Sequence, residues 1–409
     1  MKNNNLKICV MGLGYIGLPI SSLLATKGFK VHGVDITKKT VDTINSGKVH
    51  IVEPDLDILV KSAVNSGNLK ASQKPIESDV FILAVPTPFN EKNNVKTPDI
   101  SYVMKATEAI TPFIRENNLI ILESTSPTFT TEKIAEQIFK SRPELQNKIY
   151  IAHCPERVLP GNIIRELVDN DRIIGGINDE SSKKAGEFYE KICSGNIYLT
   201  DSRTAELTKL VENSYRDVNI AFANELSIIC DKLDINVWEV IEMASKHPRV
   251  NILSPGPGVG GHCIAVDPWF IVSSCPEESK LIRTAREVNL SKTQWVLNKI
   301  KDKSKKIINP VIGCLGLSFK ADIDDLRESP AMEIATTLIK EKYNVIANEP
   351  NIEDKEVENI PLFDVKEVIE KSDILCLLVN HKEYKHIHRN SFDEKIIIDT
   401  IGLQQNLKD

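Results

Sequence analysis

The 409-residue sequence lacks paired cysteines: it contains eight, and no two of them form a CxxC pair. A zinc site or a disulfide framework needs cysteines at short, regular spacings, so we expect neither, and no metal. No apolar run reaches the roughly 18 residues that span a bilayer, and no concentrated basic patch marks a nucleic-acid surface. We therefore expect a cytoplasmic protein that binds neither membrane nor nucleic acid.

The composition is that of a globular protein, with 41% hydrophobic and 26% charged residues. A chain of this length is too long for a single hydrophobic core, so we expect two or three domains. The first residues run directly into a glycine motif without the cleavage region of a secretory signal, so we expect no such signal. The net charge of −6 leaves room for small anionic ligands, which need only a few well-placed basic side chains.

Residues 7–35 predict a strand, a glycine turn, a helix and a second strand. The turn carries Gly12, Gly14 and Gly17 in a GxGxxG pattern, and Asp35 follows 18 residues after the last glycine. This is the dinucleotide-binding fingerprint: the glycines permit the turn, the approach of a pyrophosphate and helix packing, and the acid binds ribose hydroxyls. Because that acid repels the extra phosphate of NADP, we expect NAD as cofactor. The alternative is a glycine turn in an α/β domain without a ligand.

Two further buried strands end at hydroxyl residues, Thr87 and Thr125. Ligands in open α/β sheets bind outside the carboxyl ends of the strands, so both residues are placed to touch cofactor or substrate. The alternative for each is a solvated turn hydroxyl. A later strand, near residues 149–154, brings Cys154 and Glu156 to the same edge, which makes Cys154 a rival for any thiol chemistry.

Residues 204–232 contain neither proline nor glycine and predict one helix about 43 Å long. Both of its faces carry apolar residues, which indicates burial between domains or subunits. Lys209, Asn213 and Arg216 share one stripe of this helix and could converge on an anionic or oxyanionic ligand. A solvated charged face is the alternative.

Residues 247–267 form a loop rich in glycine and proline that carries Cys263 and Asp267. Glycines remove side chains, so a ligand can approach the backbone closely. A thiol that precedes a short helix-like segment gains thiolate character from free N–H groups and nearby cations. These features favour a reactive Cys263 over a buried structural cysteine.

Residues 305–350 again predict a strand, a glycine turn, a helix and a strand. The turn at 313–319 lacks the full fingerprint, so this second Rossmann-like domain more plausibly holds a different nucleotide than a second NAD. Lys320 and Arg327 bracket an acidic loop and could reach a diphosphate, which arginine binds through two parallel hydrogen bonds. Both could also be surface charges.

In their order along the chain, these motifs resemble the UDP-glucose/GDP-mannose dehydrogenase family over essentially the whole sequence. The matching pieces are GxGxxG, VPTP, ST, PE, the Lys-Asn helix, GGHC…D and FKADIDDLRESP. Within the family, HCPERVLPG and HPRVNILSPGPGVGGHCIAVDPWF resemble the branch that oxidises UDP-N-acetyl-D-mannosamine. The UDP-glucose branch usually has a lysine directly before the aspartate of the cysteine motif, where this sequence has Val266.

The resemblance implies an α/β fold with two Rossmann-like doubly wound domains joined by a central helical domain that contains one long helix. Residues 1–200 would bind NAD, residues 201–300 would form the central and dimerisation domain with the cysteine loop, and residues 301–409 would bind the UDP-sugar. It also implies self-association, as a homodimer or larger, through the central helix. Arg249 would then act in the site of the neighbouring subunit.

The implied activity is a four-electron oxidation of the sugar C6 alcohol to a carboxylate with two NAD, for surface polysaccharide or glycan biosynthesis. Cys263 would form a thiohemiacetal and then a thioester. Among the other implied catalytic residues, Lys209 and Asn213 would stabilise the oxyanion of the reacting carbon. Glu156, Thr125 and Asp267 would orient or activate the water that hydrolyses the thioester. The implied cofactor-binding residues are Gly12, Gly14, Tyr15, Ile16, Gly17, Asp35, Thr87, Thr125 and Arg327. The implied substrate-binding residues are Arg157, Val158, Lys209, Asn213, Arg216, His247, Arg249, Gly260 and Lys320.

Other functions remain as alternatives to the four-electron oxidation of UDP-N-acetyl-D-mannosamine. The nearest are dehydrogenases of UDP-N-acetylglucosamine or UDP-glucose. A two-electron hydroxyacid dehydrogenase shares the N-terminal domain and helical middle but needs neither an essential thiol nor a second nucleotide domain. A non-catalytic NAD-binding scaffold or redox sensor would not depend on Cys263 for product formation.

Overall fold

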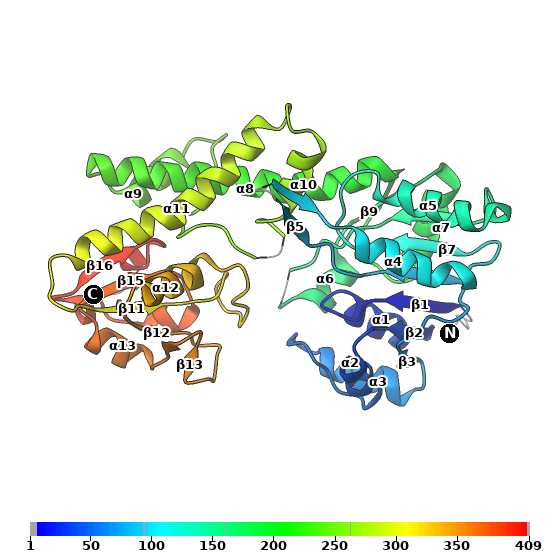
Figure 1. Ribbon diagram of the computed structural model, residues 1–409, viewed down its shortest axis with the longest axis horizontal. Helices are drawn as coiled ribbons and strands as arrows, with labels where there is room; N and C mark the ends of the chain where they lie inside the picture. Colours follow the sequence, from blue (N-terminus) through cyan, green and yellow to red (C-terminus); the bar gives the residue numbers. More distant parts are fainter. Residues whose placement is uncertain (1–5, 93–94, 160, 262, 407–409) are drawn as a thin grey trace. The chain divides into compact units, whose positions relative to one another are not determined.

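A computed structural model describes residues 6–92, 95–159, 161–261 and 263–406 of the chain. The chain divides into two compact units, Met1–Val211 and Glu212–Asp409 (Figure 1). Each unit contains a sheet with parallel strands and helices packed on it, so the expected α/β class with two Rossmann-like sheets is confirmed. Within the described residues, no helix combines the length and apolar character that crossing a membrane requires.

The first unit is built on an eight-stranded sheet. The strands of this sheet are β1 (Lys7–Met11), β2 (Lys30–Val34), β3 (Leu69–Ser72), β4 (Val80–Leu83), β7 (Leu119–Leu122), β8 (Tyr150–His153), β9 (Arg172–Gly176) and β10 (Ile197–Asp201). Strands β5 (Phe89–Lys92) and β6 (Val95–Pro98) form a separate antiparallel pair. The strand order is β10-β9-β8-β7-β4-β1-β2-β3, and only β8 and β9 pair antiparallel in this sheet as described. The chain proceeds in opposite directions on either side of β1, which creates the switch point where such sheets bind ligands.

Helices cover both faces of this sheet because alternate strand residues point to opposite sides. Ile8 and Val10 enter one core with α1, α3, α6 and α7, whereas Cys9 and Met11 enter the other with α4 and α5. The helices of this unit are α1 (Gly17–Thr26), α2 (Lys38–Asn45), α3 (Leu56–Asn65), α4 (Ser101–Ile110), α5 (Thr130–Ser141), α6 (Ile163–Asp169) and α7 (Asp179–Tyr189), with 3-10 turns η1 (Thr111–Phe113) and η2 (Pro143–Leu145).

The turn between β1 and α1 requires its first and third glycines. Gly12 has φ +90°, a conformation that residues with a side chain rarely adopt. A Cβ atom on Gly17 would lie 1.7 Å from the Gly12 carbonyl oxygen, so no other residue fits there. Around Gly14 there is open space, which leaves its backbone accessible. The geometry is that of a turn shaped to receive a pyrophosphate.

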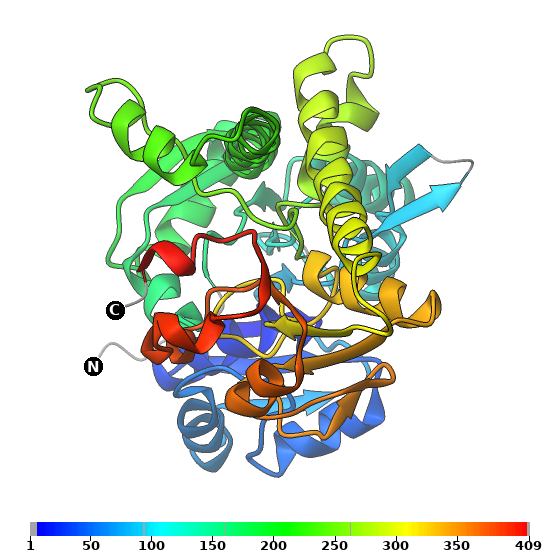
Figure 2. The ribbon, with the colours of Figure 1, turned by 90° about the vertical axis from the view of Figure 1, so that its left-hand side faces the viewer.

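Helix α8 (Ser202–Leu233) begins in the first unit and continues into the second. It starts two residues earlier and ends one residue later than the expected helix over 204–232, and it is seen almost end-on in Figure 2. Uninterrupted helix over 32 residues follows from the absence of proline and glycine between its ends.

The second unit contains a four-stranded parallel sheet of order β12-β11-β15-β16. Helices α11 and α12 pack on one face of it, and α13 packs on the other. Besides α8, the elements are α9 (Val237–Ala244), α10 (Asp267–Ser274), α11 (Lys280–Ser304), α12 (Pro330–Lys340), α13 (Val365–Lys371), β11 (Val311–Leu315), β12 (Asn344–Asn348), β13 (Glu356–Val357), β14 (Ile360–Pro361), β15 (Ile374–Leu377), β16 (Ile396–Asp399), η3 (Lys382–His386), η4 (Arg389–Phe392) and η5 (Gln404–Asn406).

A buried ion pair joins strand β9 to the residue that directly follows β7 in the first sheet. Arg172 on β9 lies with Nη1 3.3 Å from Glu123 Oε1, and the two side chains are 2% and 0% exposed. The guanidinium also donates to the Leu167 carbonyl at 3.2 Å and stacks over the Tyr189 ring. Because the charges have little access to water, each depends on the other for its solvation.

We expect Arg172→Met to lower the free energy of unfolding by about 3–5 kcal/mol, because it leaves the Glu123 carboxylate buried without its counter-charge. Urea denaturation monitored by circular dichroism measures the loss. Adding Glu123→Gln should recover part of it. The matched control is Arg165→Met, which breaks an exposed pair with Asp169 and should change little; equal losses from the two single variants would contradict the assignment.

Candidate active site

The carboxyl end of β2 lies beside the glycine turn in the first unit. Asp35 accepts the N–H of Leu13 at 3.3 Å through Oδ2 and the N–H of Thr37 at 2.8 Å through Oδ1. The carboxylate is therefore fixed at the mouth of the GxGxxG turn, where it can accept hydrogen bonds from ribose hydroxyls. Tyr15 and Ile16 follow the open Gly14 and are half-buried just before α1. These residues fit a dinucleotide with its pyrophosphate over Gly14.

The ends of the neighbouring strands β4 and β7 bring two sequence-predicted threonines together. Thr87 donates its hydroxyl hydrogen to the Thr125 carbonyl oxygen at 2.6 Å. Ser124 makes a second link between the same segments through a hydrogen bond to the Val85 carbonyl at 2.6 Å. The two segments are thus joined at the sheet edge that carries the glycine turn.

Glu156 and Lys209 form a buried pair at the end of β8. Lys209 Nζ lies 3.6 Å from Glu156 Oε1, and the two side chains are 8% and 10% exposed. The second carboxylate oxygen of Glu156 accepts the N–H of Val158 at 2.9 Å. An ammonium and a carboxylate that are shielded from bulk water can stabilise an oxyanion and hold a water molecule, respectively.

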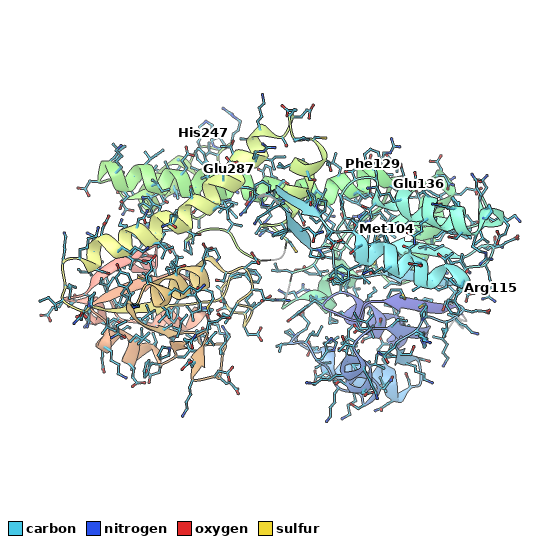
Figure 3. All side chains as sticks on the ribbon, viewed as in Figure 1. Met104, Arg115, Phe129, Glu136, His247 and Glu287 are labelled. Atoms are coloured by element: carbon cyan, nitrogen blue, oxygen red, sulfur yellow. The ribbon has the colours of Figure 1, made fainter. Side chains whose placement is uncertain are left out.

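Glu206 also belongs to this region, and sequence reasoning missed it. It lies on α8 three residues before Lys209, and its carboxylate accepts the N–H groups of Phe129 and Thr131 at 2.7 Å each and the Thr131 hydroxyl at 2.6 Å. Burial raises the pKa of this carboxyl to about 7. The contacts tie the segment after β7 to α8 near Phe129, which Figure 3 labels. The sequence signal that could have identified Glu206 is an acidic residue on the buried face of the predicted helix.

A similar brace holds the segment that follows Glu156. Glu53, 7% exposed, accepts the N–H of Gly161 at 2.8 Å and the N–H of Ile163 at 2.7 Å. Arg157 donates to the Asp171 carbonyl at 3.1 Å, and Val158 packs against the core of the first unit. Sequence reasoning missed Glu53 because its partners are backbone groups more than a hundred residues away.

In the second unit, Asn213 and Asp267 form the central contact. Asn213 Nδ2 donates to Asp267 Oδ2 at 2.5 Å, and the residues are 6% and 3% exposed. Asp267 begins α10, and the carbonyl of Cys263 accepts the N–H groups of Val266 and Asp267 at 3.0 and 2.8 Å. Cys263 therefore stands in the turn that leads into α10, and it is exposed.

The structure favours Cys263 over Cys154 for thiol chemistry. Cys154 is fully buried, and burial raises the pKa of its thiol to about 12, so it stays protonated at neutral pH. The exposed thiol in the glycine-rich loop meets the first requirement of a nucleophile, which is access to a substrate.

The remaining predicted residues of the second unit are more exposed. Arg216, His247 and Arg249 are all exposed, and His247, labelled in Figure 3, accepts the Arg249 N–H through Nδ1 at 3.3 Å. Arg327 is held by its neighbour Asp325 through two hydrogen bonds of 2.8 and 2.7 Å. Helix α8 carries Lys209 in the first unit and Asn213 four residues later in the second, so each set of site residues has a member on this helix.

Two predicted residues lie in segments with little free space. A Cβ atom on Gly260 would be 2.2 Å from the Glu328 carbonyl oxygen, so the cysteine loop passes directly against the segment before α12. The carbonyl of Lys320 accepts the Ser318 hydroxyl at 2.8 Å. Both contacts shape the end of the second sheet at which a diphosphate is expected.

The second glycine turn is held, like the first, by an acid that follows the neighbouring strand. Glu349, 3% exposed, accepts the N–H groups of Leu317 and Ser318 at 2.8 and 2.9 Å. Asp35 accepts the N–H of Leu13 in the corresponding way in the first turn. The two turns therefore share this contact, and they differ in sequence by the incomplete glycine pattern of the second.

One group of side chains in the described residues has the spacing of metal ligands: Asp322, His381 and Glu383. His381 Nδ1 accepts the Asp322 N–H at 3.0 Å, and Nε2 lies 3.2 Å from Glu349 Oε2. Both ring nitrogens are therefore already hydrogen-bonded, and a cation would have to displace one of these bonds. The cluster is better explained as a brace for the loop at residues 318–322.

Comparison with known proteins places these features in a family. Three models of the UDP-glucose/GDP-mannose dehydrogenase family match in succession: the NAD binding domain over residues 6–193, the central domain over 203–291 and the UDP binding domain over 313–406. The chain belongs to this family, as the sequence motifs indicated, and NAD is its cofactor.

Individual relatives agree over nearly the whole chain. A UDP-N-acetyl-D-mannosamine dehydrogenase from Campylobacter jejuni is 54% identical over 392 residues, which cover 92% of this chain and 96% of the relative. An NDP-N-acetyl-D-galactosaminuronic acid dehydrogenase from Ralstonia nicotianae is 50% identical over 407 residues, covering 97% and 96%. Among solved structures, a UDP-N-acetyl-mannosamine dehydrogenase from S. aureus matches with a TM-score of 0.87 and 44% identity, covering 98% of this chain and 96% of that one.

We expect iodoacetamide at neutral pH to alkylate Cys263 rapidly in the native protein, because that thiol is exposed, and to leave Cys154 unmodified. Mass spectrometry of peptides from a time course measures both rates. Cys275, which is also exposed, serves as the reference for an accessible thiol without a site around it. Labelling of Cys154 as fast as that of Cys275 would contradict the assignment.

Proposed function

We propose that the protein oxidises the C6 hydroxyl of UDP-N-acetyl-D-mannosamine to a carboxylate, consuming two NAD and one water and releasing two NADH and three protons. The observation that carries the proposal is the exposed Cys263 at the start of a helix whose first residue, Asp267, is locked to Asn213. A four-electron oxidation needs a thiol at this position, whereas a two-electron oxidation needs none.

In the first oxidation the alcohol loses a proton from oxygen and a hydride from C6, and the product is an aldehyde. Lys209, paired with Glu156, stabilises the developing alkoxide and is the candidate to take part in the proton transfer. When bound, NAD would supply the hydride acceptor for both oxidations. The residues assigned to hold it are Gly12, Gly14, Tyr15, Ile16, Gly17, Asp35, Thr87, Thr125 and Arg327.

In the second oxidation the Cys263 thiolate attacks the aldehyde carbon and forms a carbon–sulfur bond. The resulting thiohemiacetal oxygen carries negative charge, which the Lys209 ammonium and the Asn213 amide stabilise. Loss of a second hydride converts this adduct to a thioester. Because the aldehyde is held covalently, it does not escape between the two oxidations.

Hydrolysis completes the reaction when water attacks the thioester carbon and the Cys263 thiolate leaves. Glu156, Thr125 and Asp267 are the groups we assign to orient or activate that water. The nucleotide-sugar is assigned to Arg157, Val158, Arg216, His247, Arg249, Gly260 and Lys320, together with Lys209 and Asn213. The cationic members of that set suit a diphosphate.

Substrate identity has a second candidate. Two relatives that are 50% and 49% identical carry the name NDP-N-acetyl-D-galactosaminuronic acid dehydrogenase, which favours a galactosamine epimer as the alternative sugar. UDP-N-acetylglucosamine and UDP-glucose follow, and Val266 in place of the lysine of the UDP-glucose branch weighs against UDP-glucose. The product would serve surface polysaccharide or glycan biosynthesis in the cytoplasm.

The same proposal divides the chain near residues 200 and 300 into NAD-binding, central and UDP-sugar-binding domains. The start of α8 at Ser202 and the end of α11 at Ser304 support these boundaries. It also makes the protein a homodimer or larger through α8, with Arg249 serving the neighbouring site. Support comes from apolar side chains exposed along this helix, Tyr215, Phe222, Ile229 and Leu233, at 45–69%.

We expect the wild-type protein to yield two NADH per UDP-N-acetyl-D-mannosamine, and Cys263→Ser to bind the sugar nucleotide without net acid formation, because serine cannot form the thioester. Product analysis by mass spectrometry with the four candidate sugars, and calorimetry for binding, measure this. Cys275→Ser is the matched control. One NADH per sugar, or acid formation by Cys263→Ser, would reject the proposal; preferred turnover of another sugar would reject only the substrate.

We expect Phe222→Glu to shift the protein toward monomer, because a charge on the exposed apolar stripe of α8 opposes its burial in an interface. Analytical ultracentrifugation of wild type and variant at equal concentration measures the shift. Glu225→Gln, on the same exposed side of the helix, is the control. A wild-type protein that sediments as a monomer at micromolar concentration would refute self-association.

A further inference from the structure

We propose that Asn224 is a positioning residue for the reaction: it anchors the N-terminal side of the cysteine loop to α8, as Asn213 anchors the C-terminal side. The inference rests on the proposed role of Cys263 and adds a residue that none of the motifs singled out. Asn224 is fully buried and lies eleven residues, or three turns, after Asn213 on the same helix.

The cysteine loop has little structure of its own. Residues 251–261 form neither helix nor strand. Two hydrogen bonds tie backbone groups of this stretch to neighbouring helices: the Gly256 N–H donates to Asn224 Oδ1 at 2.9 Å, and the Pro257 carbonyl accepts the Thr293 hydroxyl at 3.0 Å. One side chain from α8 and one from α11 therefore help to set the path of the loop toward Cys263.

The orientation of the Asn224 amide is imposed by a chain of buried side chains. The Asp217 carboxylate, which Arg286 pairs with, only accepts, so Asn289 must present Nδ2 to it, at 2.8 Å. The Asn289 oxygen then faces Asn224, which must donate Nδ2 to it, at 2.9 Å. Only Oδ1 of Asn224 is left, and it meets the Gly256 N–H.

This ordering turns a flexible amide into a fixed acceptor. An asparagine on its own can present either nitrogen or oxygen to a neighbour. Here a reversed Asn224 would set its NH₂ group against the Gly256 N–H and its oxygen against the oxygen of Asn289, and both contacts would be repulsive. All four members of the chain are no more than 1% exposed, so water cannot relieve such a mismatch.

Close packing around the loop makes small displacements matter. A Cβ atom on Gly258 would lie 2.4 Å from Thr293 Oγ1, and the same glycine borders Pro330 at the start of α12. With one end of the loop fixed by Asn224 and the other by the Asn213–Asp267 contact, Cys263 lies in a segment held at both sides. Releasing the first anchor lets the thiol drift while the second still holds α10.

We expect Asn224→Ala to lower kcat for acid formation by about 10- to 100-fold, because a displacement of about 1 Å has that effect on a nucleophile. The KM for NAD, which binds in the other unit, should not change. The rate of Cys263 alkylation by iodoacetamide in the substrate-free protein should change as well, because the thiol is no longer held. Asn219→Ala is the control, since Asn219 lies on the same helix and donates to the Tyr215 carbonyl within that helix.

Asn224→Asp separates positioning from stability. Aspartate keeps an acceptor for the Gly256 N–H but sets a carboxylate against the Asn289 oxygen. We therefore expect Asn224→Asp to be more active than Asn224→Ala but to have a lower melting temperature.

Thr293→Val removes the donor to the Pro257 carbonyl at nearly constant volume. It should lower kcat, as Asn224→Ala does, and it serves as the second variant if Asn224→Asp does not fold.

Two results would overturn the proposal: Asn224→Ala with the kcat and Cys263 alkylation rate of Asn219→Ala, or activities that follow only the folded fraction across the series. If no sugar nucleotide is oxidised by the wild type, the proposed function fails, but the alkylation rates still decide whether Asn224 positions the loop.

Discussion

The hydrogen bond from Asn213 to Asp267 is the contact on which the arrangement of the second unit's site depends. It joins the long helix α8 to the first residue of α10, and the turn that opens α10 is closed on the carbonyl of Cys263. Both partners are nearly inaccessible to solvent, so the contact is not weakened by competition from water. The turn that carries the thiol is therefore tied to one register of α8.

Missing side chains are the second constraint, and they act at the first glycine turn and in the cysteine loop. At Gly17 the backbone of the first turn approaches so closely that a methyl group would overlap the Gly12 carbonyl, and at Gly260 the cysteine loop passes the Glu328 carbonyl in the same way. These glycines do more than supply flexibility. They let two backbone segments pass in direct contact, which no residue with a side chain would allow at these positions.

Much of this could be predicted from the sequence because the signals are local. The glycine spacing with Asp35 predicted the first turn, and the absence of proline and glycine predicted α8 to within two residues at its start. The strand ends predicted that Thr87 and Thr125 would share an edge, and they are hydrogen-bonded. In each case the pattern lies within one element or between neighbouring strands of a parallel sheet.

What the sequence did not reveal depends on backbone groups far away along the chain. Glu206 and Glu53 each bind two backbone N–H groups that any residue would offer, so no pattern marks their partners. The stripe of Lys209, Asn213 and Arg216 also did not reveal burial: Arg216 is exposed, whereas Lys209 and Asn213 are buried. Helical periodicity predicts which face of the helix a side chain lies on. Whether that side chain is buried depends on which segments pack against the helix at that position along its axis.

The spacing of Lys209 and Asn213 follows from their positions on a single long helix. Each unit completes one buried contact on α8: Glu156 with Lys209 in the first, and Asp267 with Asn213 in the second. Four residues of helix separate the two side chains, a rise of about 6 Å along the axis. Because an α-helix resists stretching and unwinding over one turn, the ammonium and the amide keep their spacing whatever loops do elsewhere. The spacing of these two positions along α8 is thereby fixed by covalent geometry and backbone hydrogen bonds, the stiffest means that a chain of this kind possesses.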